Sequence, residues 1–139
     1  TYIARESGAR SERGEFKLGS LQPVYCTSAG KLLLACLSDA DRSEMVDNLG
    51  FRPYTERTIL DREHLRADLE QIRRQGYSID NGEYSEFWRS IAVPVTNSAG
   101  DTIAAITCGG RPEAMTVEHQ GWFRQEMSVL VEELSGQLA

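Results

Sequence analysis

A loop of small and hydroxyl-bearing residues leads directly into an apolar run at residues 22–37. Pro23 has a fixed φ and no N–H group, so a helix has to begin after it. Thr27 or Ser28 can then cap a helix that begins near Ala29. Because the N-terminus of a helix carries free N–H groups and a partial positive charge, it favours an anion. The segment predicts either a site for a small acidic ligand or only a capped, buried helix.

Lys31 follows Gly30, and the two form a Gly-Lys pair like that of the phosphate-binding loops of nucleotide hydrolases. That motif requires a glycine five residues before the pair and Ser or Thr directly after it. Tyr25 and Leu32 occupy these positions. A phosphate loop is therefore excluded, and we expect Lys31 to reach solvent or to bridge to a neighbouring carboxylate.

The cysteines and histidines do not form a metal or disulfide pattern. Cys26, Cys36 and Cys108 are odd in number, and their spacings fit neither a disulfide framework nor a zinc site. We expect buried free thiols in a reducing cytoplasm. His64 and His119 lie in polar helical stretches without a ligand-type neighbour at helical spacing, so no metal and no cofactor is expected.

An enzyme is the second functional class to consider. Cys26 or Ser28, near the start of a helix, can act as a nucleophile if a base activates it. The two histidines lie in helix-surface contexts, and the sequence contains no nucleophile-elbow motif. We therefore predict that the chain is not an enzyme.

Composition and charge exclude further classes. The 139 residues are 40% hydrophobic, which suits one domain with a single core. With 21 acidic and 15 basic side chains the formal charge is -6, so this segment is not expected to grip nucleic acid itself. No apolar run approaches the length of a membrane span, and no basic-then-apolar export signal opens the chain.

Apolar spacing and capping residues predict four helices. Leu65, Leu69 and Ile72 fall on one helical face, and Gly76 ends that helix. The opposite face is charged and is expected to face solvent. The helices are expected at residues 28–37, from 38 to a stop at Gly50, at 62–75, and from 117 to about 138; Ser38, Asp61 and Thr116 cap the last three, and the final helix presents a stripe of Phe123, Met127, Leu130, Leu134 and Leu138.

Alternating apolar residues and turn signals predict the strands. Asn81-Gly82 is a tight-turn dipeptide, residues 97–101 form a hairpin connection, and Pro94 indicates an edge strand or a bulge. The hairpin makes the sheet at least partly antiparallel, and helices grouped against such a sheet indicate an α+β fold. Strands are expected at residues 1–4, 15–18, 77–80, 90–96 and 102–108, with the last, most apolar one at the centre of the sheet.

Six short motifs occur in a familiar order. They lie at residues 19–23 (Gly-Ser-Leu-Gln-Pro), 27–31 (Thr-Ser-Ala-Gly-Lys), 54–59 (Tyr-Thr-Glu-Arg-Thr-Ile), 72–83 (Ile-Arg-Arg-Gln-Gly-Tyr-Ser-Ile-Asp-Asn-Gly-Glu), 91–95 (Ile-Ala-Val-Pro-Val) and 104–106 (Ala-Ala-Ile). From about Gly19 to Leu138 the chain resembles the effector-binding domain of the IclR family of bacterial transcription regulators.

This resemblance implies a GAF-like α+β domain, with a mostly antiparallel sheet flanked by helices, that binds a small organic or aromatic acid. Residues 1–139 would form this single domain, in a homodimer or homotetramer. DNA would be reached only through a winged helix-turn-helix domain that precedes it in such regulators. The strand-like start without an initiator Met agrees with a piece of a longer protein. A GAF-type sensor from another signalling system, with a nucleotide or chromophore, is the alternative.

The resemblance also implies which residues meet the effector. Their hydroxyls and backbone amides suit a carboxylate, and Asp80 suits an effector hydroxyl. Each has an ordinary alternative: Asp80 can cap the following turn, Ser90 and Thr107 can be plain strand residues, and Trp88 can belong to the core. The matching positions are Ser28, Ala29, Asp80, Trp88, Ser90, Thr107 and Gly109.

Two bulky aromatics depart from the family pattern. Phe87 and Trp88 stand where the family commonly has Gly and a small or aliphatic residue. They can shrink the site, stack on an aromatic effector, or face a dimer surface. The sequence leaves these alternatives open.

Overall fold

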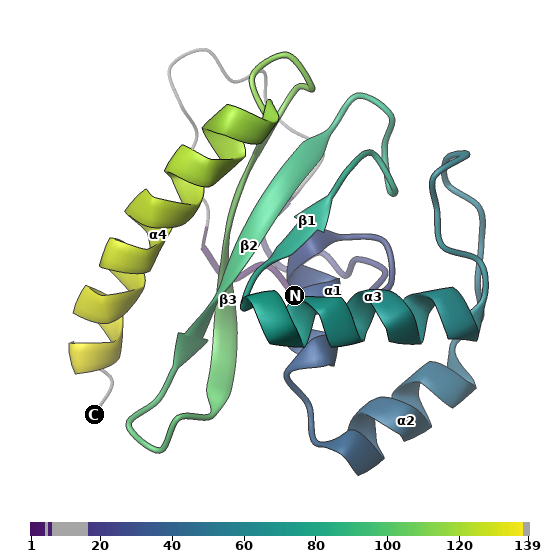
Figure 1. Cartoon of the computed structure of the whole chain (residues 1–139), viewed down its shortest axis with the longest axis horizontal. Helices are drawn as coiled ribbons and strands as arrows, with labels where there is room; N and C mark the ends of the chain where they lie inside the picture. The colour runs from purple at the N-terminus through teal and green to yellow at the C-terminus, as the bar shows by residue number, and fades with distance from the viewer. Residues whose placement is uncertain (5, 7–16, 138–139) are drawn as a thin grey trace.

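A computed structural model describes residues 1–4, 6 and 17–137, and Figure 1 shows a sheet with α4 along one side and α1 and α3 on the other. Within these ranges the order is α1 (Ser28–Ala35), α2 (Asp39–Asn48), α3 (Arg62–Gln75), β1 (Ser78–Asp80), β2 (Arg89–Thr96), β3 (Thr102–Gly110) and α4 (Val117–Gln137). The predicted α+β fold is therefore confirmed. No helix in these ranges combines the length and apolarity needed to cross a membrane.

The sheet is antiparallel, with strand order β1-β2-β3. Among the described residues, the prediction that residues 102–108 form the central strand is wrong, because β2 has a neighbour on each side and β3 pairs only with β2. The place of a strand in a sheet depends on pairing between segments that are distant in sequence. The apolar residues of β3 indicate only that other elements cover the faces of this strand, not that it has a strand on each side. Pro94 lies beyond the short β1 and next to a register shift between Val95 and Thr96, in agreement with the predicted bulge.

The two faces of the sheet differ in chemistry. Toward α4, Ile91 and Val93 pack with Met115 and Met127 in an apolar cluster. Side chains alternate along a strand, and antiparallel partners point to the same side. The face toward α1 therefore carries small and polar residues, namely Ser78, Asp80, Ser90, Ala92, Thr107 and Gly109.

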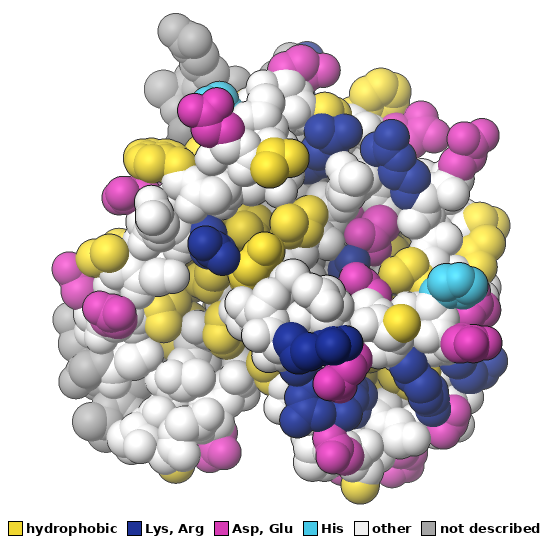
Figure 2. All heavy atoms as spheres, in the orientation of Figure 1, with side chains coloured by type: hydrophobic (Ala, Val, Ile, Leu, Met, Phe, Trp, Pro, Cys, Tyr) yellow, Lys and Arg dark blue, Asp and Glu magenta, His cyan; other side chains and the backbone are white. Residues whose placement is uncertain are grey.

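Local signals placed the helices well. The side chains of Thr27, Ser38 and Asp61 each accept a backbone N–H at the start of α1, α2 and α3, and Gly76 ends α3 with φ of 77°. α3 buries its predicted stripe of Leu65, Leu69 and Ile72. Over its charged face and α2, acidic and basic side chains alternate (Figure 2), with ion pairs Arg73–Asp39 and Arg66–Asp47. The predicted solvated face is confirmed for Arg66, Glu70, Arg73 and Arg74, whereas Asp68 is only partly exposed and pairs with the buried Lys31.

Several predictions about the termini need correction. Residues 1–4 and 17–18 are not strands, although Gly19 N donates to Tyr2 O over 2.8 Å; residues 15–16 lie outside the described residues. On α4, Phe123 and Met127 pack on the sheet, but Leu130 and Leu134 are 50% and 41% exposed. Val131 is the next residue that faces the sheet, since it follows Phe123 and Met127 at intervals of four residues on the same side of the helix. Leu138 lies outside the described residues.

The prediction of buried thiols holds only for Cys26. Cys36 is exposed at the end of α1, and Cys108 is partly buried on β3. Which face of a helix touches the core depends on the elements that pack against it. The position of Cys36 in the sequence alone therefore did not show that its side chain is exposed.

Candidate ligand-binding site

The N-terminus of α1 is held in a tight loop. Thr27 Oγ1 accepts the N–H of Gly30 at 3.2 Å and donates to Pro23 O at 3.0 Å. A Cβ on Gly30 would lie 2.6 Å from Val24 Cα, so only glycine allows this approach. Of the two possible caps, Thr27 is the one used, which leaves the Ser28 side chain for a tertiary contact.

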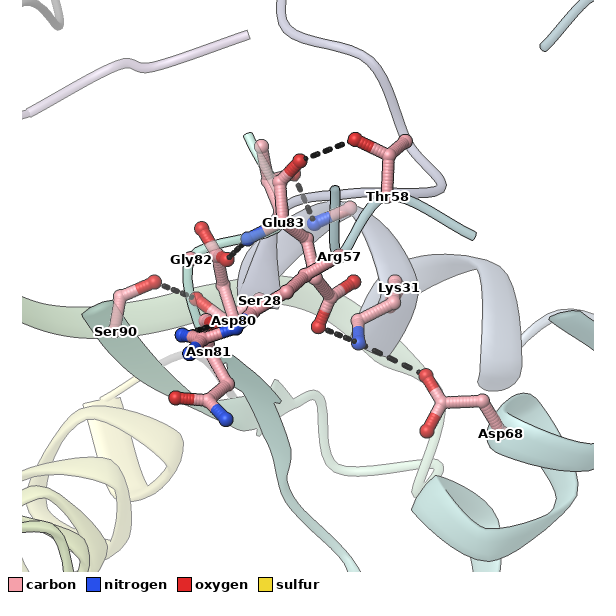
Figure 3. A network of polar contacts seen from close by, with 12 residues as sticks. Ser28, Lys31, Arg57, Thr58, Asp68, Asp80, Asn81, Gly82, Glu83 and Ser90 are labelled. Atoms are coloured by element: carbon pink, nitrogen blue, oxygen red, sulfur yellow. Dashed lines mark hydrogen bonds and ion pairs between the residues drawn. The ribbon is translucent and has the colours of Figure 1, made fainter. Parts of the chain in front are cut away.

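Ser28 joins α1 to the middle strand. Its hydroxyl lies 2.7 Å from that of Ser90, although the two residues are 62 positions apart, and both side chains are buried (Figure 3). Ala29, the next residue of α1, is partly buried. Two of the residues that the resemblance implies meet the effector, Ser28 and Ser90, therefore lie in direct contact.

One row across the sheet contains three of the predicted residues. Asp80 of β1 is the register partner of Ser90 in β2, and Ser90 is in turn the partner of Gly109 in β3. A Cβ on Gly109 would lie 2.7 Å from Trp88 Cζ2 and 2.9 Å from Ser90 Cβ. The indole of Trp88 therefore lies directly against Gly109, while Phe87 is 79% exposed.

The neighbouring row adds two hydroxyls. Ala92 pairs with Ser78 on one side and with Thr107 on the other. The hydroxyl oxygens of Ser78 and Thr107 are buried and have no hydrogen-bond partner among the residues that the structure describes. A buried hydroxyl without a partner is unfavourable, so both are candidates to bind a ligand or water. Ser78 was not predicted, although its place two residues before Asp80 puts it on the same face.

Asp80 is almost fully buried at the end of β1. Its Oδ1 accepts the N–H of Glu83 at 2.7 Å, which is the predicted turn cap. Burial raises the pKa of Asp80 to about 6, against the opposing effect of the turn's N–H groups. Burial and the nearby Asp80 carboxylate also raise the pKa of Tyr2, a neighbour that the sequence did not indicate. The role of Asp80 in effector binding stays a prediction.

Lys31 is buried between two carboxylates. Its Nζ lies 2.8 Å from Asp68 Oδ2 on α3 and 2.7 Å from Glu83 Oε1 in the turn after β1 (Figure 3). Burial alone would lower the pKa of Lys31, but Glu83 and Asp68 together raise it above its ordinary value. Of the two predictions for Lys31, the bridge to a neighbouring carboxylate is therefore the correct one. Its charge is neutralised, so hydroxyls and N–H groups remain as the donors closest to the Asp80–Ser90 row.

The outer side of this turn is fixed by threonines. Thr55 Oγ1 donates to Gly82 O and Thr58 Oγ1 to Glu83 O, each over 2.7 Å. An open cleft of about 360 Å³ lies beside it, lined by Lys31, Arg57, Ile59, Asp68, Asn81 and Glu83. These contacts hold the backbone that presents Asp80.

The chemistry of Cys26 does not suit a nucleophile. Its side chain is fully buried, and burial raises the pKa of the thiol to about 12. A protonated, enclosed thiol is the opposite of an activated cysteine. This observation removes Cys26 as a candidate nucleophile.

Comparisons with known proteins agree with this structure. Residues 1–136 match the family described as bacterial transcriptional regulator IclR, C-terminal. The Pca regulon regulatory protein of Pseudomonas putida is 36% identical over 106 residues, which are 76% of this chain and 36% of that protein. The crystal structure of the Thermotoga maritima IclR superposes with a TM-score of 0.89 at 27% identity, over 96% of this chain and 54% of that chain.

A third relative was solved with a ligand. It is a double mutant of the PobR inducer-binding domain from Acinetobacter, in complex with 3-hydroxybenzoic acid. It superposes with a TM-score of 0.77 at 27% identity, over 94% of this chain and 73% of that chain. These matches favour the regulator over a GAF-type sensor from another system. The chain belongs to the IclR family of bacterial transcriptional regulators and corresponds to its C-terminal, effector-binding domain.

Proposed function

We propose that this domain senses a small organic or aromatic acid on the α1-facing side of the sheet. The observation that carries the proposal is the 2.7 Å contact between the hydroxyls of Ser28 and Ser90, which brings a helix N-terminus onto the polar row of the sheet. The proposed effector-binding residues are Ser28, Ala29, Asp80, Trp88, Ser90, Thr107 and Gly109.

The chemistry of this face supports an acid as the ligand. The N–H groups at the start of α1 and the Ser28 and Ser90 hydroxyls can donate to a carboxylate. Asp80 can accept from a hydroxyl of the effector. One relative supports this class, because the PobR inducer-binding domain was solved in complex with 3-hydroxybenzoic acid.

Binding would matter through its effect on DNA. In the proposed regulator, a winged helix-turn-helix domain on the N-terminal side contacts the operator. The effector-binding domain itself carries no enzymatic activity. An effector that binds two arrangements of the protein with different affinity shifts their populations. The regulator would work in the cytoplasm, where bacterial DNA lies.

We further propose that the domain works as a homodimer or homotetramer. Trp122, Leu130 and Leu134 on α4 are each at least 41% exposed and give this helix an apolar outer surface. Such a surface suits contact with a second copy. Sedimentation of the purified chain over a range of concentrations would measure the state directly.

A thermal-shift screen tests the proposed site. The parent chain and its Ser28→Ala, Ser90→Ala and Asp80→Ala variants would be melted with short-chain and aromatic carboxylic acids. A ligand that binds only the native state raises Tm by mass action. We expect at least one acid to stabilise the parent and to lose this effect in the variants.

Ser128→Ala is the matched control. Ser128 is exposed on α4, on the opposite side of the sheet, and donates only to Arg124 O among the contacts described. This variant should respond to the acid as the parent does. Equal responses of all variants would place the acid elsewhere, and an absence of any response in the parent would contradict the function.

A further inference from the structure

The contact between Trp88 and Gly109 bears on the size of the effector. The nearest indole atoms to a Cβ built on Gly109 are Cζ2 at 2.7 Å and Nε1 at 2.8 Å, distances that a real Cβ could not keep. The same edge of the indole thus takes the space that any side chain at position 109 would need. The glycine allows the indole to rest on the strand.

The three positions of the Asp80–Ser90–Gly109 row are all covered on this face. The Ser28 hydroxyl contacts that of Ser90, and the Trp88 indole lies on Gly109. Asp80 is 1% exposed, and its carboxylate accepts a hydrogen bond from Glu83 N. A small carboxylate would take the place of the contact between the two serines. A planar ring laid along the row also needs the volume that the indole fills.

We propose that Trp88 is a specificity-determining residue that restricts the effector to short-chain carboxylic acids and excludes ring acids. This inference rests on the proposed function, because it assumes that an acid binds at the Ser28–Ser90 contact. Phe87, the other aromatic at this bend, has no part in the restriction since its side chain is exposed. Gly109 acts with Trp88 by giving the indole its place.

Replacing the indole should enlarge the site by about the size of a benzene ring. A large-to-small substitution leaves a cavity when the surroundings relax only partly, and an apolar cavity can bind an aromatic ring. Trp88→Ala should therefore gain affinity for ring acids. Trp88→Leu keeps apolar bulk and serves as the second variant if Trp88→Ala folds poorly.

The experiment measures affinities by titration calorimetry for two panels of acids. One holds pyruvate, glyoxylate and lactate, and the other holds benzoate and 3-hydroxybenzoate. We expect the tightest ligand of the parent to be a short-chain acid, and Trp88→Ala or Trp88→Leu to bind a ring acid at least about tenfold more tightly than the parent does. Adding Ser90→Ala should remove this gain, and Trp122→Phe, on α4, should show none.

The possible results separate this inference from the proposed function. If the parent binds a ring acid as tightly as the Trp88 variants do, or if these variants gain nothing, the size restriction is wrong while the acid site stands. If neither the parent nor the variants bind any acid of the two panels, both the site and the restriction are wrong.

Discussion

The ammonium of Lys31 lies 2.7 Å from Glu83 Oε1, across 52 residues of sequence, in a place where only 3% of the lysine side chain is exposed. This contact ties the first helix to the turn that follows β1. The same ammonium pairs with Asp68 on α3 at 2.8 Å. One buried cation thus connects three elements around the row that contains Asp80.

Replacing Lys31 with methionine should destabilise the domain. The substitution leaves Glu83, whose side chain is 10% exposed, without its cation, while Asp68 can turn toward water. Removal of one partner from a buried ion pair lowers the free energy of unfolding by about 3 kcal/mol, measured by urea denaturation. Adding Glu83→Gln should recover part of this loss.

Lys17→Met is the control for the loss of a positive charge. Lys17 is exposed, and its replacement should change the free energy of unfolding by less than about 0.5 kcal/mol. If Lys31→Met is as mild as Lys17→Met, the buried ion pairs do not stabilise the fold.

Asp80→Asn should stabilise the domain increasingly as pH rises. The pKa of Asp80 is raised to about 6 from 3.8, so the folded state holds its proton where the unfolded state has released it. The stability that Asp80 contributes is therefore full below about pH 4 and is lost as pH rises to about 6. Asparagine removes this loss, which amounts to ~2–3 kcal/mol.

The measurement is the difference in unfolding free energy between Asp80→Asn and the parent at a series of pH values. Taking the difference cancels the titration of other carboxyls that the substitution does not touch. A flat difference for Asp80→Asn would mean that the carboxyl is ionised in the fold at little cost.

The helices were predictable because their signals are local. Asp61, the apolar stripe of α3 and Gly76 lie within one short segment, and each was placed correctly. The order of the three described strands, with β2 rather than β3 in the middle, was not predicted, because strand order depends on pairing between distant segments. The prediction of which α4 residues face the sheet was partly wrong for the same reason. Whether Leu130 or Val131 meets the sheet depends on the angle at which the helix packs.

Membership of the effector site stays a prediction, but the contacts among its proposed residues can be compared with the sequence. The resemblance pointed to Ser28, Ser90 and Gly109, which the fold brings together, but it did not show that Trp88 fills the space over Gly109. Spacing left Lys31 free to face solvent or a carboxylate. Its choice depends on Asp68 and Glu83, which approach only when α3 and β1 are packed.

Gly109→Ala should disturb the site from the β3 side. The added methyl group would meet the Trp88 indole and Ser90 Cβ at distances below 3.0 Å, so the indole has to move. We expect a loss of ~1–3 kcal/mol in unfolding free energy. In a Trp122→Phe background, which leaves Trp88 as the only tryptophan, the fluorescence emission should also shift.

The adjacent glycine provides the control for this experiment. A Cβ on Gly110 would meet Met115 Cγ at 3.6 Å, an ordinary contact distance. Gly110→Ala should therefore be neutral or stabilise by up to about 0.5 kcal/mol. Trp88→Ala should relieve the effect of Gly109→Ala. If it does not, the overlap with the indole is not the cause of the instability.

Gly30→Ala should loosen the loop that places Ser28. The new Cβ would lie 2.6 Å from both Thr27 Oγ1 and Val24 Cα, and the second of these is backbone, which cannot turn aside. We expect a loss of about 3 kcal/mol in unfolding free energy and weaker binding of any acid that stabilises the parent. Gly121, inside α4 with nothing within 4 Å of its Cβ position, is the matched site.

Gly121→Ala should raise the unfolding free energy by about 0.5–1 kcal/mol, because alanine loses less backbone freedom in a helix than glycine does. It should leave acid binding unchanged. Gly30→Ala and Gly121→Ala therefore make the same chemical change but should change the free energy of unfolding in opposite directions. A mild effect of Gly30→Ala would show that the loop between Val24 and Thr27 can shift, and the close approach of α1 to the sheet would then not depend on this glycine.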